Sequence, residues 1–396
     1  MPAETAPLEI ASSRRREAAA GVTLPPAWVS LLIAGVLQCF CWPVVTLDMT
    51  VWLLPWFDHI VASGPVGAFA TPFSNYTPPY LYLLAAASIL DGWLSPFAIV
   101  KIVAISGLIP LALAVRCALR VFGAEDPVRG AALAVALPSV AINSGWMGQC
   151  DTFWVAAMVM AVAAAGGKHH ATMLAWCGLA VAFKAQALFA APFFLALVLS
   201  RRVSWRLLPI APAVATAAML PAWAAGWPAA DLATIYLRQT GTFGALSMNA
   251  PNIWSIVGVM PIPPVISLDR VALAAAIAAS LSYVAWFGSR PMEGRRLVLA
   301  ALLAPLLTVG LLPHMHERYF ILADVLALIF ALTARDGQGW RIAILVQVGS
   351  LAALLAFILE WQIAAALGGI AMILATDLVI RRLRSEQSGR TDPNVP

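Results

Sequence analysis

Short polar segments interrupt a chain that is otherwise rich in Leu, Ala, Val and Ile. The most unusual is "LLPHMHERYF", residues 311–320, where His314, His316, Glu317 and Arg318 stand together. Such groups can move protons, bind an anion or hold a metal ion. Zinc is one interpretation, but residues two apart do not share a helix face, and the sequence has no HExxH motif. We therefore expect no metal here, although Glu317 and Arg318 could also form a simple interfacial ion pair.

Two further segments carry acids or amides suited to chemistry. Asp48, in "TLDMT", directly follows the first long apolar run and has no basic neighbour in sequence. It could end or cap a helix, or act as a general base. The turn "NSGWMGQCDTFW", residues 143–154, carries Gln149 and Asp151. These side chains suit hydroxyl binding, although Asp151 could also cap the following helix.

The last two segments lie further along the chain. Lys184 and Gln186 stand in "AFKAQALFAAP", between two short apolar runs. Lys184 is either a snorkelling lysine or a cation for a phosphate. Asn249 and Asn252, in "LSMNAPNIWSI", are turn residues first and candidates for sugar contacts second. An ionisable group close to a bilayer is costly, so each charged residue here is a functional hypothesis.

The elements that position these side chains must lie in a membrane. Of the 396 residues, 62% are hydrophobic and 11% charged, whereas soluble domains carry about 25% charged residues. Long Ala/Leu-rich runs without alternation predict an all-α, polytopic transmembrane helical bundle and not a barrel. We expect about 11–13 spans of ordinary or shortened length. They are residues 27–47, 79–90, 97–119, 128–145, 149–166, 171–184, 186–200, 207–225, 265–287, 297–313, 319–334, 340–359 and 362–380.

The charge pattern orients these spans. Basic residues gather in alternate loops, so the net charge of +5 reflects membrane orientation and not nucleic-acid binding. The same rule favours 79–90 as a partial helix. We expect cytoplasmic tails at 1–26 and 381–396, the latter disordered, around a membrane domain at 27–380 in a bacterial-type inner (plasma) membrane. The loops expected on the outer face are 47–78, which is amphipathic, 144–151, 226–262, which has almost no helical periodicity, and 313–318.

In chain order, these motifs resemble those of the GT-C glycosyltransferases, polytopic enzymes that use polyprenyl-phosphate sugars. Asp48 follows the first span, "NYTPPYLYLL" with Tyr76 ends the first outer loop, a "GQCD" turn comes next, and "HMHERYF" comes late. The last stretch resembles that of dolichyl-phosphate-glucose-dependent glucosyltransferases, and "NAPNIW" resembles a segment of bacterial members. A single acid at the span exit and the absence of a large C-terminal soluble domain depart from the oligosaccharide transferases. Both departures favour a monosaccharide transferase without a metal.

The resemblance implies a hexosyltransferase, with mannose or glucose as the sugar. It would move one hexose from polyprenyl phosphate to a periplasmic or extracellular glycan, glycolipid or protein by a single inverting displacement, with no cofactor. Asp48 would be the catalytic base. Donor contacts are expected from Lys184, Gln186, His314, His316, Glu317 and Arg318, and acceptor contacts from Tyr76, Gln149, Asp151, Asn249 and Asn252. The alternative is a flippase or another transporter, although the chain shows no paired inverted repeats.

Overall fold

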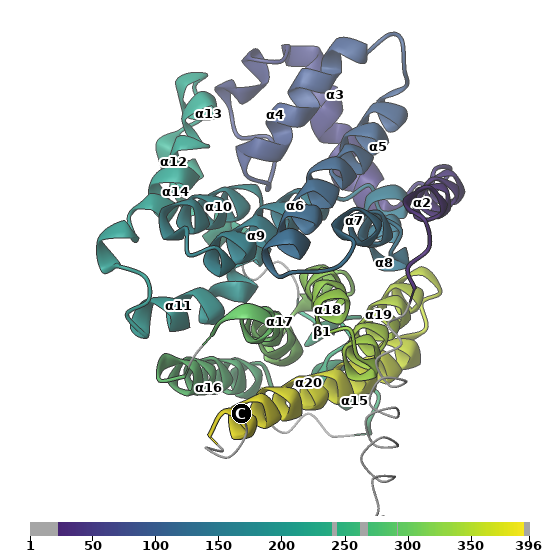
Figure 1. Ribbon diagram of the computed structural model, residues 1–396. Coiled ribbons are helices and arrows are strands. Elements are labelled where there is room, and N and C mark those ends of the chain that lie inside the picture. Colours follow the sequence, from purple (N-terminus) through teal and green to yellow (C-terminus); the bar gives the residue numbers. More distant parts are fainter. Residues whose placement is uncertain (1–22, 240–243, 262–267, 291, 392–396) are drawn as a thin grey trace, which may run out of the picture.

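The computed structural model describes residues 23–239, 244–261, 268–290 and 292–391, and these residues are almost entirely helical (Figure 1). Within these ranges the only strands are the two-residue β1 (Ser247–Met248) and β2 (Met315–His316). The expected all-α class is therefore confirmed. The predicted tails fall partly outside the described residues, at 1–22 and 392–396. The part of the C-terminal tail up to residue 391 continues the last helix, so its expected disorder is wrong there.

Most helices begin and end within a few residues of the expected spans. In the first half they are α2 (Ala27–Cys41), α4 (Pro78–Ala87), α5 (Pro96–Ser106), α6 (Leu108–Val121), α7 (Pro127–Val135), α8 (Pro138–Ala141), α9 (Asp151–Gly166), α10 (His170–Phe183) and α11 (Ala191–Leu199). In the second half they are α16 (Leu268–Gly288), α17 (Gly294–Leu311), α18 (Ile321–Ala334), α19 (Gly337–Ile358) and α20 (Gln362–Thr391).

Shorter elements connect these helices. They are η1 (Met49–Leu53), α3 (Leu54–Ser63), η2 (Gly67–Ala70), η3 (Ser88–Leu90), η4 (Ile142–Trp146), η5 (Ala185–Ala190), η6 (Trp205–Leu207), α12 (Ile210–Ala217), α13 (Leu220–Ala224), α14 (Ala229–Gln239) and α15 (Ile253–Gly258). Two predictions fail in this set. The span expected at 207–225 is broken into α12 and α13, because Pro221 restarts the helix. The loop expected at 226–262 contains α14 and α15, and α14 is helical because it docks Ile235 and Tyr236 on a hydrophobic core.

The lengths of the helices fit a multi-pass membrane protein. Among the described residues, five helices are long and apolar enough to cross a membrane, or six if the bent pair α7 and α8 is one span. Six further apolar helices have 10–17 residues. The expected count of 11–13 spans stays a prediction. One of these six covers Pro78–Leu90 and joins α4 to η3. That this segment crosses the membrane only in part stays a prediction.

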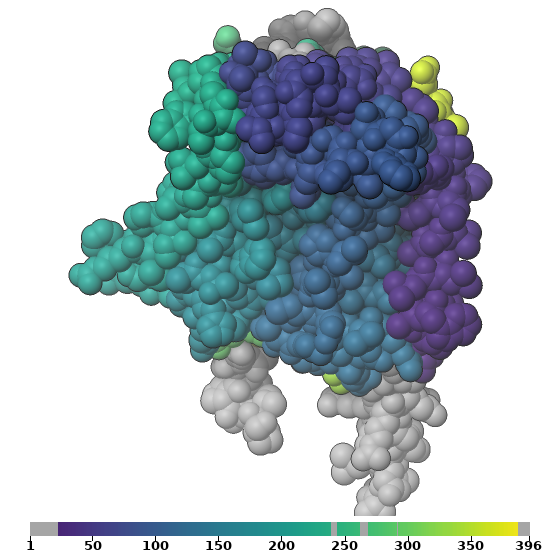
Figure 2. Space-filling model, turned by 90° about the horizontal axis from the view of Figure 1, so that it is seen from above, coloured from purple at the N-terminus to yellow at the C-terminus, as the bar shows by residue number. Residues whose placement is uncertain are grey.

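Two hydrophobic cores hold the fold. The larger one is built from α6, α9, α10, α17, α18 and α19, and α18 is buried along its whole length. The smaller one joins η1, α3, α4 and α5 to Trp227 and Ile235. Figure 1 shows α17 and α18 below α6, α7 and α9, with α3, α4 and α5 grouped at the top of that view. In Figure 2 the purple α2 runs down one side, and the indigo segment that follows it lies across the top.

Lys101 fixes the junction between these two cores. It lies in α5, its side chain is fully buried, and its Nζ donates to the carbonyl oxygens of Cys41, Gly145 and Trp146. Those carbonyls end α2 and η4, where the helices leave backbone acceptors without partners. One ammonium group therefore ties together the two chain segments that lead to Asp48 and to Gln149.

The polar loops gather at two ends of the bundle. At one end, loops predicted to be cytoplasmic contact one another through Arg335–Glu125 at 2.7 Å and Lys168–Glu293 at 3.7 Å. At the other end, loops predicted to be outside meet around Arg318. The apolar core separates the two groups, and which of them faces the cytoplasm stays a prediction.

Candidate functional site

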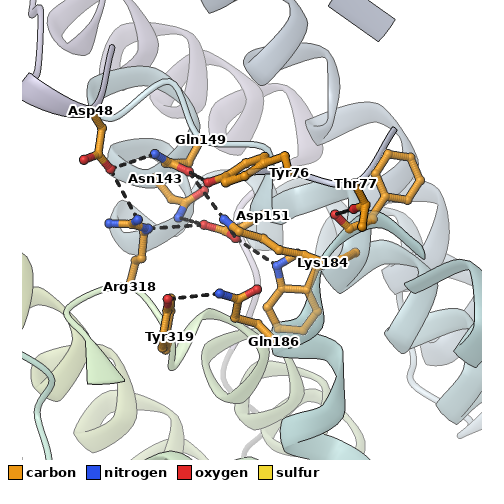
Figure 3. Close-up of polar contacts among 12 residues, drawn as sticks. Asp48, Tyr76, Thr77, Asn143, Gln149, Asp151, Lys184, Gln186, Arg318 and Tyr319 are labelled. Carbon is orange, nitrogen blue, oxygen red and sulfur yellow. Dashed lines mark hydrogen bonds and ion pairs between the residues drawn. The ribbon is translucent and has the colours of Figure 1, made fainter. Parts of the chain in front are cut away.

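Three loops meet around the side chain of Gln149. Asp48 stands one residue before η1, Tyr76 precedes α4, and Gln149 precedes α9. The Gln149 side chain donates to Asp48 Oδ2 at 3.0 Å and accepts from the Tyr76 hydroxyl at 2.9 Å (Figure 3). A turn at Ser74, whose hydroxyl accepts from Tyr76 N at 2.8 Å, presents the ring. Residues separated by up to 101 positions are thus held in one hydrogen-bonded chain.

A buried ion pair lies behind this chain. Lys184, at the end of α10, places its Nζ 2.6 Å from Asp151 Oδ1, and the two side chains are 6% and 2% exposed. Asp151 does not cap α9, since its oxygens accept from Asn143 Nδ2 at 2.8 Å and Trp154 Nε1 at 2.9 Å. Lys184 also lies 4.9 Å from the centroid of the Tyr76 ring. Every charge in this part of the site is therefore matched by a specific partner.

Arg318 joins the two groups. Its guanidinium pairs with Glu317, approaches Asp48 Oδ2 at 3.3 Å and lies 3.9 Å from Asp151 Oδ2. Burial by itself would raise the pKa of the Glu317 carboxyl, but the charge of Arg318 and a hydrogen bond from His316 hold that pKa below its usual range. Arg318 is therefore the cation on which the three carboxylates of the site converge. Figure 3 shows its contacts with Asp48 and Asp151.

The "HMHER" segment is positioned by a short parallel strand pair. Ser247 pairs with Met315 and Met248 pairs with His316, so β1 and β2 fix the segment before α18 begins. His314, directly before β2, has a positive φ of 60°, so this segment is not helical. The result points Glu317 and Arg318 into the interior, where their side chains are 1% and 9% exposed.

Gln186 and Tyr319 form the adjoining wall. Gln186 Nε2 donates to the Tyr319 hydroxyl at 3.0 Å (Figure 3). The Tyr319 ring lies 5.1 Å from that of His316 and 5.5 Å from that of Phe189. Tyr319 belongs to the quoted "HERYF" stretch, but sequence reasoning gave it no role, since an aromatic residue beside an apolar run is usually core.

Two of the predicted contacts do not join the network. His314 adopts a positive φ of 60° and bonds Ala245 O at 2.7 Å, and its Nε2 lies 3.5 Å from the exposed Asp269. Asn252 caps α15, with Oδ1 accepting from Trp254 N at 3.1 Å and Ser255 N at 3.2 Å. Both side chains are used in holding loops in place.

Asn249 takes an intermediate position. It has a positive φ of 61° and forms an isolated backbone bridge with His316. It therefore borders the site through its backbone. The predicted residues that the structure brings together are Asp48, Tyr76, Gln149, Asp151, Lys184, Gln186, His316, Glu317 and Arg318.

The structure bears on two interpretations of the sequence, a snorkelling Lys184 and a bound metal ion. Lys184 does not snorkel, because its side chain is buried and ion-paired. Across the part of the chain that is described, no three His, Cys, Asp or Glu side chains are grouped so that they could hold a metal ion. The expectation of a reaction without metal stays a prediction.

The site contains one accessible acid. Asp48 is 31% exposed, whereas Asp151 and Glu317 are 2% and 1% exposed. Asp151 and Glu317 are bonded to Lys184 and Arg318. Asp48 is therefore the acid of this site that a substrate could reach.

No family model matches this chain, and no curated protein matches it in sequence.

Proposed function

We propose that this chain is an integral-membrane glycosyltransferase of the GT-C type. It moves one hexose, mannose or glucose, from polyprenyl phosphate to a glycan, glycolipid or protein acceptor on the outer face of the membrane. The observation that carries the proposal is the network itself. Asp48, Gln149, Asp151, Lys184 and Arg318 come from four separate segments and meet at one end of an apolar helical bundle.

Asp48 is the base in this proposal. It is the most exposed of the three acids, and Gln149 and Arg318 fix its Oδ2 from two sides. A single inverting displacement needs one group to take the proton of the attacking hydroxyl. Asp48 would take that proton while the hydroxyl oxygen bonds to the anomeric carbon, and the bond from that carbon to the phosphate oxygen breaks. No second carboxylate is needed, in contrast to glycosidases.

Arg318 is the group that would stabilise the departing phosphate. A planar guanidinium suits a phosphate because it donates two parallel hydrogen bonds. Lys184 was also expected to contact the phosphate, but its Nζ is buried and bonded to Asp151 and Gln149. We therefore assign Lys184 a positioning role, in which it holds Asp151 behind the guanidinium.

An apolar groove supports a lipid-linked substrate. A cavity of about 650 Å³ lies between α2, α5 and α6, and its lining is apolar apart from Gln38, Cys39 and the indole N–H of Trp42. Gln38 donates to Ser144 Oγ at 3.0 Å, and the neighbouring Asn143 bonds Asp151. The groove therefore borders the segment 143–144, which contacts Asp151 of the charged network. A hydrocarbon chain in the groove would lie close to that network. The groove is lined mainly by Leu31, Ala34, Trp42, Ile105, Leu108 and Ile109.

The test is Asp48→Asn in purified protein supplied with a polyprenyl-phosphate hexose and candidate acceptors. Loss of a general base costs about 10²–10⁴-fold in rate, so kcat should fall by that factor while donor KM does not rise. Asp58→Asn is a matched control, since Asp58 is an exposed acid in the neighbouring α3. If Asp48→Asn retains kcat within about threefold of the Asp58→Asn protein, at equal thermal stability, Asp48 is not the base.

A second candidate function rests on one observation. The helices α7 and α8 form a broken pair bent by 51°, and broken helices at membrane depth are typical of transporters. A transporter of lipid-linked sugars would move its substrate between leaflets without consuming it. In reconstituted vesicles, leaflet exchange with no sugar transfer would favour this function over the transferase.

A further inference from the structure

A second polar cluster lies inside the apolar core, apart from the site above. It consists of Asp324 on α18, Ser139 on α8, and Gln347 and Ser350 on α19. Asp324, Ser139 and Ser350 are each only 3% exposed, and Gln347 is half-buried. Among the described residues, no hydrogen bond or ion pair joins this cluster to the Arg318 network.

The cluster leaves polar atoms without partners. Ser350 and Ser139 lie close enough to the Asp324 carboxyl to interact with it, but neither Asp324 oxygen has a hydrogen bond of good geometry in the described chain. The hydroxyl of Ser350 and Nε2 of Gln347 are unpartnered as well. The one contact made is from Ser139 Oγ to Gln347 Oε1, at 3.3 Å. A buried carboxylate in this state is costly, and it must gain either a proton or a cation.

The backbone around the cluster is also interrupted. The 51° bend between α7 and α8 falls at Pro138, directly before Ser139. Non-helical backbone at membrane depth is tolerated where it lines a polar cavity, and such breaks often coordinate small cations. The cluster and the break therefore coincide.

We propose that Asp324, Ser139, Gln347 and Ser350 form a binding site for an alkali cation. Oxygens that share a cation lie side by side without hydrogen bonds of good geometry between them, as the Asp324 and Ser350 oxygens do here. One carboxylate balances one positive charge, and hydroxyl and amide oxygens complete the set of hard ligands. A protonated Asp324 is the alternative: it would donate one hydrogen bond and could accept others from the serine hydroxyls, and infrared spectroscopy distinguishes the two states.

The probe is sodium, measured by thermal unfolding of the full chain in detergent. NaCl replaces N-methyl-D-glucamine chloride at constant ionic strength, and ²²Na⁺ binding gives the stoichiometry. We expect a saturable rise in Tm with sodium and one bound ion per chain. Asp324→Asn should abolish both, and Ser350→Ala should weaken the apparent affinity by about tenfold, as expected for about 1.4 kcal/mol.

The controls separate the site from general salt effects. Asp377→Asn removes an exposed acid of α20 that pairs with Arg381, and it should keep the full sodium response. The proposal is overturned if the wild type shows no sodium-specific rise, or if Asp324→Asn keeps it. An infrared band of a protonated carboxyl that persists in sodium and vanishes in Asp324→Asn would also overturn it, because Asp324 would then hold a proton.

Discussion

The buried ion pair between Lys184 and Asp151 gives the most direct test of the charged network. Its atoms are 2.6 Å apart and its side chains are 6% and 2% exposed. Removing one partner of such a pair costs about 3–5 kcal/mol, because the other charge is left buried and alone. Lys184→Met keeps the length of the side chain, and Asp151→Asn keeps its shape. Each variant should therefore lower the free energy of unfolding by about 3–5 kcal/mol.

The double variant distinguishes a pair from two separate effects. With both charges gone neither is stranded, so the loss should be smaller than the sum of the single losses by about 2–3 kcal/mol. The amide of Asn143 can turn to suit Asp151→Asn, because its Oδ1 has no partner among the described residues. The free energies are measured by SDS titration in mixed micelles, followed by circular dichroism.

An exposed pair provides the comparison. Arg381 and Asp377 lie 2.7 Å apart, but their side chains are 71% and 47% exposed. Arg381→Ala should therefore cost only about 0–1 kcal/mol. Single losses at Lys184 and Asp151 that add within about 0.5 kcal/mol would show that the two side chains do not act as a pair. A loss at Arg381 equal to that at Lys184 would refute the argument from burial.

Two further variants test the edges of the site. Tyr76→Phe removes the hydroxyl that holds Gln149. Since a net hydrogen bond is worth about 0.5–1.5 kcal/mol, kcat should fall about 2–10-fold in a transfer assay. An unchanged kcat would contradict a positioning role for Tyr76. Burial raises the pKa of Tyr76 to about 12, above about 10 in the unfolded chain. The contribution of the neutral Tyr76 to stability is therefore complete below pH 10 and is lost as the pH rises towards 12. Thermal unfolding of the wild type and of Tyr76→Phe as a function of pH measures this loss. Asn252→Ala removes the cap of α15 and should cost about 1–2 kcal/mol in unfolding free energy while donor KM stays within about twofold; a large change in KM would instead return Asn252 to the site.

The helices were the most predictable part of the fold. Apolar runs set the ends of α9, α10 and α17 to within a few residues, because a spanning helix must be apolar over nearly its whole length. The failures came where a short local signal was passed over. In α14, Leu232, Ile235 and Tyr236 stand at helical spacing, and these residues pack on the smaller hydrophobic core.

The residues of the site could be named from sequence, but their roles could not. Loop charges placed Asp48, Gln149, Lys184 and Arg318 at one end of the bundle, where the structure also gathers them. Pairing was not predictable, because Lys184 and Asp151 are 33 positions apart and either could have faced solvent. Exposure separates the three acids, and exposure depends on the packing of the whole loop layer.

Two lone charges in apolar runs gave a usable signal that sequence reasoning passed over. Lys101 stands in "AIVKIVAI" and Asp324 in "ILADVLALIF". An ionisable residue inside a membrane helix needs a partner or a function. Lys101 has its partners in three carbonyl oxygens, whereas neither Asp324 oxygen has a hydrogen bond of good geometry in the described chain. The same rule, applied to every apolar run, would have marked both Lys101 and Asp324 as residues that need a partner or a function.

The charge balance of the network also orders the proposed reaction. Arg318 already faces three carboxylates, so a donor phosphate can reach it only by replacing one of them. Glu317 and Asp151 are buried and bonded elsewhere, whereas Asp48 is the most exposed and lies 3.3 Å from the guanidinium. Asp48 is therefore the acid that a phosphate would displace. In the proposed function, binding of the donor and release of the base become one event, and an acceptor hydroxyl meets a free Asp48 only when the sugar is in place.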